Sequence, residues 1–192
     1  MEVITSREDL NKIKKPVSAA IGIFDGIHRG HYAVLQKALE ESRANNLTSV
    51  VLTFRSKGCQ LPSSKNSDEQ ISSKSLFLGV LEDLGVDVVI LMPFEEIRHM
   101  SPEEFVKEVL IDDLGTKFIS CGIDFHFGKN AAGTWKDLHL FGKKYGMVVD
   151  AVPIVMFNDM PISSTRIRHA LSEGEIPEAN DMMGHRYAID FE

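Results

Sequence analysis

The chain has little of several features that define whole classes of protein. Of its 192 residues only two are cysteines, Cys59 and Cys121, and they lie far apart. So few cysteines exclude a disulfide framework, and no Cys and His residues are paired at the spacing that a structural zinc site requires. This usage is typical of a reducing compartment, and we predict a cytoplasmic protein.

The sequence also lacks long hydrophobic runs and an excess of positive charge. Its apolar runs are too short to cross a bilayer, and the N-terminus lacks the basic and then apolar layout of a signal peptide. The formal net charge is −7, so the surface offers no general attraction to nucleic acid or to an anionic membrane. We therefore expect small-molecule substrates as partners, with neither nucleic acid nor membrane. The sequence gives no indication of the oligomeric state.

The remaining composition is that of an ordinary globular protein. Hydrophobic residues make up 43% of the chain and charged residues 26%. A chain of this length is long enough to bury a core of its own. Because no repeat and no shift in composition divides it, we predict one domain over residues 1–192.

Strand-like and helix-like segments alternate along the sequence. Strands are predicted at 16–24, 47–54, 86–92, 117–122 and 147–152. Helices are predicted from 31 and from 101, and at 73–84, 135–145, 165–173 and 177–183. A hairpin or a sharp turn is predicted at 155–162. This order predicts an α/β fold, a Rossmann-like doubly wound and mostly parallel sheet with helices on both faces. Its ligand should lie at the carboxyl ends of the strands.

The stretch from Gly22 to His31 carries the clearest chemical signal. It links a predicted strand to an amphipathic helix through a glycine-containing turn, and it places His28 three residues before His31. Such a turn faces the free backbone N–H groups and the positive end of the helix, which commonly hold a phosphate. Gly26 and Gly30 are positions where a side chain would block the turn or a polyanion. The stretch matches neither a Walker P-loop nor a dinucleotide fingerprint.

A second cluster opens a predicted helix near the C-terminus. It contains Ser163, Ser164 and Thr165, followed by Arg166 and Arg168. The hydroxyl groups could simply cap the helix, and the arginines could be solvated. The same groups gathered within a few residues would also bind a polyphosphate.

A third cluster, residues 122–133, directly follows a predicted strand. It contains Asp124, Phe125 and Phe127, and then a loop that runs to Gly133. One interpretation is a turn with two core phenylalanines. Its position at the carboxyl end of a strand favours a binding site instead.

Taken together, these motifs resemble the nucleotidylyltransferase superfamily. His-x-Gly-His occupies 28–31, and Ile-Ser-Ser-Thr-x-x-Arg occupies 162–168. Three further motifs narrow the resemblance: Gly-x-Phe-Asp-Gly at 22–26, Asp-Phe-x-Phe-Gly-Lys-Asn-x-x-Gly at 124–133, and Met-Gly-His-Arg-Tyr at 183–187. The chain looks like the FMN adenylyltransferase module of the bacterial bifunctional riboflavin kinase/FAD synthetase family. The likeness covers about residues 18–187.

The resemblance implies a reaction and a set of site residues. FMN and ATP would give FAD and pyrophosphate, with Mg²⁺ bridging phosphate oxygens. The residues implied as catalytic are His28, His31 and Arg168. Those implied for ATP are Phe24, Asp25, Gly26, Gly30, Ser163, Ser164 and Thr165. Those implied for FMN are Phe127, Phe105 and Asp124, and Asp124 is also the candidate magnesium ligand. The family's riboflavin kinase domain would begin where this chain stops, so no flavokinase activity is expected.

The chain departs from the family pattern on the flavin side. Arg55-Ser56-Lys57-Gly58 stands where the family commonly has Pro-His-Pro, and Phe77 stands where it often has Lys. Two alternatives therefore stay open. One is an adenylyl- or cytidylyltransferase acting on another phosphorylated acceptor, such as phosphopantetheine or a sugar-alcohol phosphate. The other is a divergent paralogue that binds flavin or nucleotide with little turnover.

Overall fold

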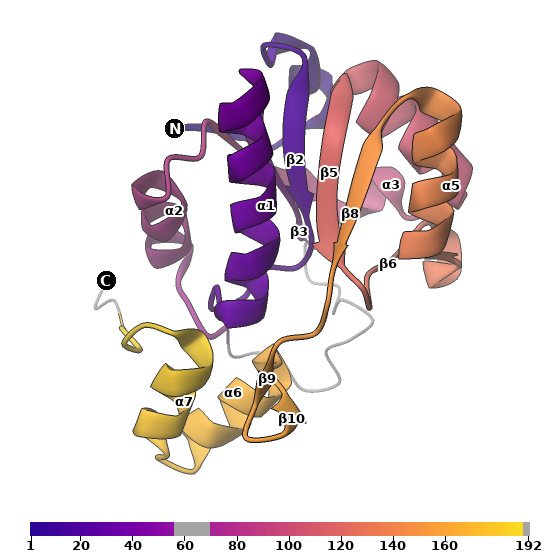
Figure 1. The fold of residues 1–192 in the computed structure, drawn as a ribbon. Helices are drawn as coiled ribbons and strands as arrows, with labels where there is room; N and C mark the ends of the chain where they lie inside the picture. Colours follow the sequence, from indigo (N-terminus) through magenta and orange to yellow (C-terminus); the bar gives the residue numbers. More distant parts are fainter. Residues whose placement is uncertain (56–69, 190–192) are drawn as a thin grey trace.

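The fold is built on a parallel sheet. The computed structural model describes residues 1–55 and 70–189, and within them six strands lie in the order β1-β4-β3-β2-β5-β8. They are β1 (Glu2–Ile4), β2 (Val17–Ile21), β3 (Thr48–Arg55), β4 (Val88–Pro93), β5 (Thr116–Gly122) and β8 (Val148–Val152). Every neighbouring pair is parallel. The order runs outward from β2 through β3 and β4, and then from β5 to β8 on the other side (Figure 1). The predicted doubly wound α/β fold is confirmed, and its switch point lies between β2 and β5.

Helices cover both faces of the sheet because its strands are apolar on both sides. One face packs against α1 (Arg29–Asn45) and α2 (Lys74–Asp83). The other packs against η1 (Arg7–Lys12), α3 (Phe94–Ile97), η2 (Phe105–Asp113) and α5 (Trp135–Tyr145). The short α4 (Pro102–Glu104) leads into η2 and contacts α5. Along β2, Ala20 faces the first of these helix layers, and Ala19 and Ile21 face the second, as strand alternation requires.

The switch point holds helix α1 through two buried serines. Ser18 of β2 donates its hydroxyl hydrogen to the carbonyl of Ala38, and Ser120 of β5 donates to the carbonyl of Val34, each at 2.7 Å between oxygens. The predicted apolar face of this helix is buried. The N-terminus of α1 is thereby held at the carboxyl edge of β2 and β5 (Figure 1).

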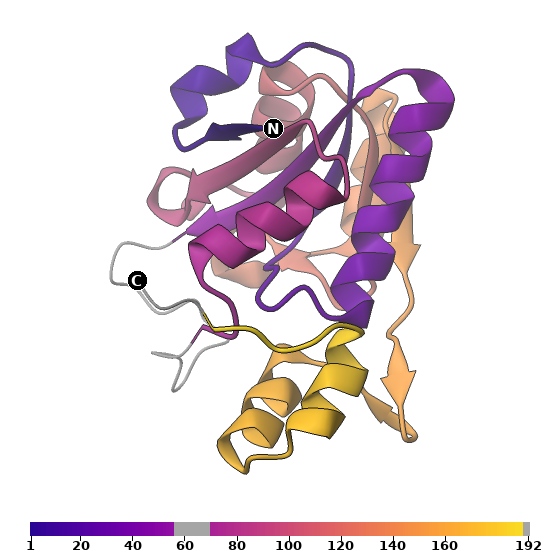
Figure 2. The same cartoon turned by 90° about the vertical axis from the view of Figure 1, so that its left-hand side faces the viewer.

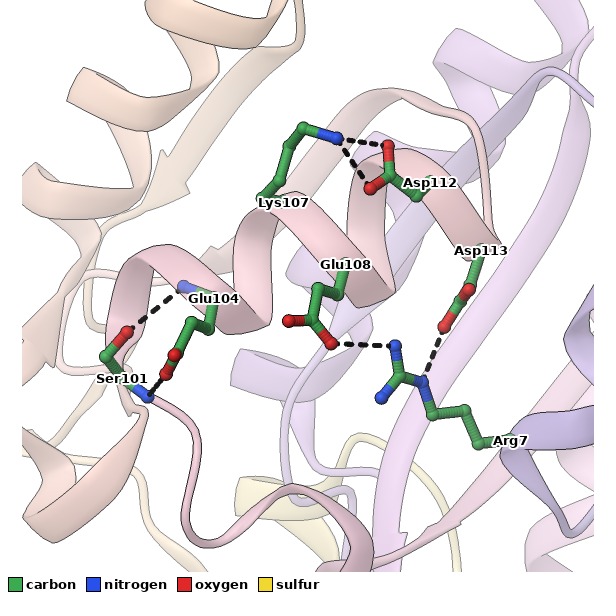
Figure 3. A network of polar contacts seen from close by, with 7 residues as sticks. All are labelled: Arg7, Ser101, Glu104, Lys107, Glu108, Asp112 and Asp113. Carbon is green, nitrogen blue, oxygen red and sulfur yellow. Dashed lines mark hydrogen bonds and ion pairs between the residues drawn. The ribbon is translucent and has the colours of Figure 1, made fainter.

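The segment from Ser101 to Asp113 begins as predicted and continues differently. The order Ser-Pro-Glu-Glu at 101–104 favours a capping box, and Ser101 and Glu104 form one. The helix buries Phe105, Val109, Leu110 and Leu114, whose spacing indicates its inward face. After α4, however, the backbone widens into the π-helical η2, which apolar spacing does not reveal. Figure 3 shows the capping box and, at the far end of η2, Arg7 paired with Asp113 and Glu108. These ion pairs tie η1 to η2 at the amino edge of the sheet.

A small helical module lies beyond the carboxyl edge of the sheet (Figure 2). It comprises β9 (Met156–Phe157), β10 (Met160–Pro161), α6 (Ser164–Ser172) and α7 (Ile176–Met183), with an apolar cluster of its own that includes Ile71. The predicted hairpin is confirmed: Asn158 and Asp159 have left-handed backbones with φ of 51° and 59°.

Several elements were not predicted from the sequence. They are β1, η1 and α3, together with β6 (His126–Phe127), η3 (Lys129–Ala131) and β7 (Gly133–Thr134). Each spans six residues or fewer, which is too short for a periodic pattern to stand out. The first predicted strand, 16–24, is shorter in the structure and ends at Ile21. The altered stretch at 55–61 lies almost entirely outside the described residues. In the described part of the chain no helix is both long and apolar enough to cross a membrane.

Candidate active site

A cleft of about 980 Å³ opens at the switch point of the sheet. Its walls come from the turn after β2, the loop after β5, the segment after β8 and the start of α6. Nine of the predicted site residues line it: Phe24, His28, Gly30, His31, Phe105, Asp124, Phe127, Ser163 and Ser164. The structure thus brings together three motifs that lie at 22–31, 122–133 and 162–168 in the sequence. Four predicted residues, Asp25, Gly26, Thr165 and Arg168, lie behind or beside this wall.

His28 and His31 form a stacked pair at the start of α1. Their ring centroids are 3.6 Å apart and the planes differ by 17°, and Phe24 meets His31 edge-on at 5.3 Å. His28 is the N-cap residue, and its Nδ1 accepts the backbone N–H of His31 at 3.3 Å. An imidazole nitrogen usually fills a capping role poorly compared with Ser or Asp, so the position has a histidine for another reason.

Burial keeps both histidines neutral. It lowers the pKa of His28 to about 4, and burial together with the neighbouring His28 holds the pKa of His31 well below its usual 6.5. Because Nδ1 of a neutral His28 accepts a hydrogen bond, its ring proton must be on Nε2. In His31 the enclosed nitrogen is Nδ1, which has no hydrogen-bond partner in the described part of the chain. His28 therefore offers an Nε2–H donor, and His31 offers a neutral ring with one N–H rather than a positive charge.

Gly30 is required by the histidine pair. A Cβ atom at this position would lie 3.1 Å and 3.2 Å from two ring atoms of His28, closer than side chains normally approach. At Gly26 the backbone φ is +76°, and a Cβ atom would lie 2.6 Å from Cγ2 of Ile71. Gly30 therefore leaves room for the ring of His28. Gly26 allows the left-handed backbone of the turn and the close approach of Ile71.

The first turn of α6 faces the same cleft. Ser163 caps the helix by accepting the N–H of Arg166, and the hydroxyl of Ser164 donates to the backbone carbonyl of Asp25 at 3.2 Å. The capping interpretation of Ser163 is thus confirmed, and both serines also line the cleft. Thr165 is exposed on the outer side of the turn.

The two arginines of this motif differ in their surroundings. Arg166 donates to the carbonyls of Phe157 and Met160 and pairs with Glu178, so it holds the small module together. Arg168 instead pairs with Asp25 through one nitrogen, at 2.8 Å. Within the described residues the guanidinium of Arg166 has three hydrogen-bond acceptors and that of Arg168 has one, so Arg168 is the less engaged of the two.

The opposite half of the cleft is aromatic. Phe125 and Phe127 stack with planes 8° apart, and Phe105 lies 5.8 Å from Phe127. The loop that carries Phe127 packs closely against Pro102. Only glycine fits at Gly128 and Gly133, since an added Cβ atom would lie 2.9 Å or less from atoms of Pro102. Phe105 and Phe127 also belong to the buried core, at 2% and 6% exposure, as the interpretation of this cluster as core phenylalanines expects. They form an apolar floor under this half of the cleft.

Asp124 is the candidate magnesium ligand on the cleft wall. No three His, Cys, Asp or Glu side chains gather as a metal site within residues 1–55 and 70–189. Magnesium commonly takes one or two carboxylates and completes its shell with water and substrate phosphates. A single carboxylate facing the histidine pair fits that type of site and no all-protein cage.

Some residues of the cleft were missed by sequence reasoning. They are Pro153, Ile154 and Val155, which follow β8 and line the cleft. The position of this segment after a strand end was a signal, but its apolar residues had no chemical signature. His185, predicted only as part of a family motif, contacts the carbonyl of Gly26 through Nε2 at 3.1 Å.

Comparison with known proteins gives a consistent result. The model of the FAD synthetase family matches residues 10–166. A bifunctional riboflavin kinase/FMN adenylyltransferase of Buchnera aphidicola subsp. Schizaphis graminum is 30% identical over 191 residues, which are 98% of this chain and 61% of the relative. The protein of that name from Escherichia coli strain K12 is 32% identical over 170 residues, 88% of this chain and 54% of the relative. The chain spans between half and two thirds of the length of these relatives.

Two solved structures are similar. A protein described as a macrolide-efflux protein from Streptococcus pneumoniae superposes with a TM-score of 0.81 and 29% identity, over 97% of this chain and 62% of the other. A pantoate-β-alanine ligase from Francisella tularensis superposes with a TM-score of 0.57 and 13% identity, over 95% and 86%. The second likeness shows the fold alone.

Proposed function

The chain belongs to the FAD synthetase family, and we propose on that basis that it transfers AMP from ATP to the phosphate of FMN, giving FAD and pyrophosphate. The observation that carries the proposal is the cleft at the switch point. There the neutral His28–His31 pair at a helix N-terminus faces a wall of stacked phenylalanines. One half of this cleft is suited to phosphates and the other to a planar ring.

The phosphate half of the cleft offers hydrogen-bond donors and a helix N-terminus, which is what nucleotidyl transfer to a phosphate requires. The attacking group is a phosphate oxygen of FMN, which is already an anion, so no strong general base is needed. Catalysis then consists of alignment and of stabilising negative charge on the α-phosphate and the departing pyrophosphate. The Nε2–H group of His28, the ring N–H of His31 and the positive end of α1 would be the donors in this role.

The triphosphate would extend from the histidine pair toward α6. Ser163 and Ser164 supply hydroxyl groups at the start of that helix, and Thr165 and Arg168 lie next to them. Mg²⁺, bound by the phosphates with help from Asp124, would neutralise part of the charge on the leaving group. Phe24, Gly26 and Gly30 form the turn that leaves room for the phosphates.

The aromatic half makes FMN the favoured acceptor. Phe127, Phe105 and Asp124 all line the cleft, the two phenylalanines as part of the core beneath it. Ring stacking would orient the acceptor so that its phosphate approaches the α-phosphate of ATP in line. We further expect the enzyme to act in the cytoplasm on small-molecule substrates, in keeping with its low cysteine content and its net negative charge.

A product assay tests the proposal. The protein is incubated with ATP and Mg²⁺ and, in separate reactions, with FMN, phosphopantetheine, a sugar-alcohol phosphate or no acceptor, and also with CTP in place of ATP. We expect FAD and pyrophosphate in equal amounts in the reaction with FMN and ATP, and neither product in the other reactions. Pyrophosphate release with another acceptor only would favour a different transferase of this superfamily. Tight FMN binding without FAD over hours would favour a divergent binding protein.

A further inference from the structure

The carboxylate of Asp25 joins three segments that are distant in the sequence. Its Oδ1 accepts the backbone N–H of Ile71 at 2.9 Å, in the segment that leads into α2. Its Oδ2 accepts a hydrogen bond from Nη1 of Arg168 in α6 at 2.8 Å. Both carboxylate oxygens are therefore engaged by protein groups, and Asp25 does not line the cleft.

The backbone around Asp25 is bound to the small module as well. The hydroxyl of Ser164 donates to the carbonyl of Asp25, and the ring of His185 contacts the carbonyl of Gly26. The turn after β2 thus packs against the start of α6 and is hydrogen-bonded to it. Ser164 and Arg168 are four residues apart on α6, so they share one face of the helix.

Charge argues against direct contact between Asp25 and a nucleotide. A carboxylate beside a triphosphate would repel it, and burial already raises the pKa of Asp25 despite its hydrogen bonds to Ile71 and Arg168. Arg168 is the complementary case. Beyond Asp25, its guanidinium has no hydrogen-bond partner in residues 1–55 and 70–189, and one helical turn before it Ser164 lines the cleft.

We infer that Asp25 is a positioning residue, which holds the guanidinium of Arg168 at the edge of the cleft so that its remaining N–H groups face a bound triphosphate. This inference rests on the proposed use of ATP, and it replaces the direct nucleotide contact that the sequence suggests for Asp25. A guanidinium is a planar fork, so a carboxylate that holds one edge fixes the direction of the other. Without it, a long and flexible side chain would have to be ordered by the ligand itself.

The test uses equilibrium binding of the non-hydrolysable analogue adenosine 5′-(β,γ-imido)triphosphate, without any acceptor. Asp25→Asn keeps an oxygen for the N–H of Ile71 but turns an N–H toward Arg168, which releases the guanidinium. We expect this variant to bind the analogue about 10-fold more weakly, the size of a typical coupling between contacting groups. Arg168→Gln should weaken binding at least as much. The double variant should match Arg168→Gln within about 2-fold, because Asp25 acts only through Arg168.

Two comparisons separate positioning from a loss of structure. AMP has no β- or γ-phosphate, so its affinity should change by less than about 2-fold in Asp25→Asn. Asp113→Asn removes a matched ion pair at the amino edge of the sheet: Arg7 and Asp113 are 2.6 Å apart and 28% and 31% exposed, against 2.8 Å and 26% and 20% for Arg168 and Asp25 (Figure 3). This control should bind the analogue as the unchanged protein does.

Several results would overturn the inference. One is that Asp25→Asn weakens binding of the analogue equally in the presence of Arg168 and in the Arg168→Gln background. Another is that Asp25→Asn binds the analogue more tightly than the unchanged protein. A third is that Asp25→Asn loses as much affinity for AMP as for the analogue. Should Asp25→Asn fail to fold, Arg168→Lys provides the test: lysine keeps the charge but lacks the fork, so it should bind the analogue as weakly as Arg168→Gln. Binding as tight as in the unchanged protein would also overturn the inference. Because no acceptor is present, an error in the proposed acceptor would leave these results unaffected.

Discussion

Two histidines that stay neutral are an unusual way to bind a polyanion, and their position explains it. A charged imidazolium would attract phosphate more strongly, but burial under Phe24 and against the sheet disfavours the charge. A neutral Nε2–H donor keeps its proton throughout the physiological range. It can therefore stabilise charge that develops in the transition state without first being titrated by the substrate.

Replacing His31 tests this role. His31→Ala should lower turnover by about 10²- to 10³-fold, the usual loss when one transition-state donor is removed. Turnover is measured at saturating substrate, and circular dichroism shows whether the variant is folded. His139→Ala, at an exposed position on α5, is the matched control and should keep full activity. Unchanged turnover in a folded His31→Ala protein would remove His31 from the mechanism.

The buried His28 also predicts how stability depends on pH. Its pKa is about 4 in the folded protein and about 6.5 in the unfolded chain, so the unfolded state binds the proton first as the pH falls. Its contribution to the free energy of unfolding is complete above pH 6.5 and is progressively lost between pH 6.5 and 4, a total loss of roughly 3 kcal/mol.

Urea denaturation at a series of pH values measures this loss. The unchanged protein should lose stability steeply below pH 6.5, and His28→Gln should give a flatter curve over the same range. NMR of the His28 ring should show no titration between about pH 8 and 5.5 in the folded state. A ring that titrates near 6.5 would contradict the neutral pair.

At the scale of elements, the turn between β2 and α1 depends on its glycines. Gly26 and Gly146 both have a left-handed backbone, with φ of +76° and +73°. Of the two, only Gly26 has a close neighbour among the described residues, since an added Cβ atom would lie 2.6 Å from Cγ2 of Ile71. Gly146→Ala should therefore cost about 1–2 kcal/mol from backbone strain alone. Gly26→Ala should cost a further 1–3 kcal/mol or so from overpacking.

Thermal and urea denaturation of the two variants gives the comparison. Because the turn also seats α6, Gly26→Ala should in addition weaken nucleotide binding, whereas Gly146→Ala should not. Equal costs for the two substitutions would show that the packing of Ile71 against the turn is loose.

The predictable elements are those whose pattern is long enough to read. Helix α1 and its apolar face, the capping box at Ser101 and the hairpin at 155–162 follow from residue periodicity and turn chemistry. The two-residue strands β6 and β7 and the π-helical η2 do not, because tertiary contacts decide them. One such contact is the packing of Gly128 against Pro102, which cannot be predicted from the sequence around either residue.

At the scale of the whole molecule, the site is an assembly of two parts. The sheet supplies the histidine turn and the aromatic wall, and the module of α6 and α7 adds the hydroxyl groups and Arg168 from the other side. Sequence motifs predicted nine of the residues that line the cleft, since each belongs to a recognisable cluster. They did not show that Arg166 and Arg168 have different partners, because that depends on the packing of α6 against the turn at Asp25.

The central claim is that AMP moves from ATP to the phosphate of FMN, and label transfer tests it most directly. FMN is incubated with the protein, Mg²⁺ and ATP carrying ³²P at either the α- or the γ-phosphate, and the flavins are separated by chromatography. We predict that the α-label appears in FAD and that the γ-label appears only in pyrophosphate. Transfer of the γ-label to a flavin, or an unlabelled flavin pool with both forms of ATP, would contradict the account.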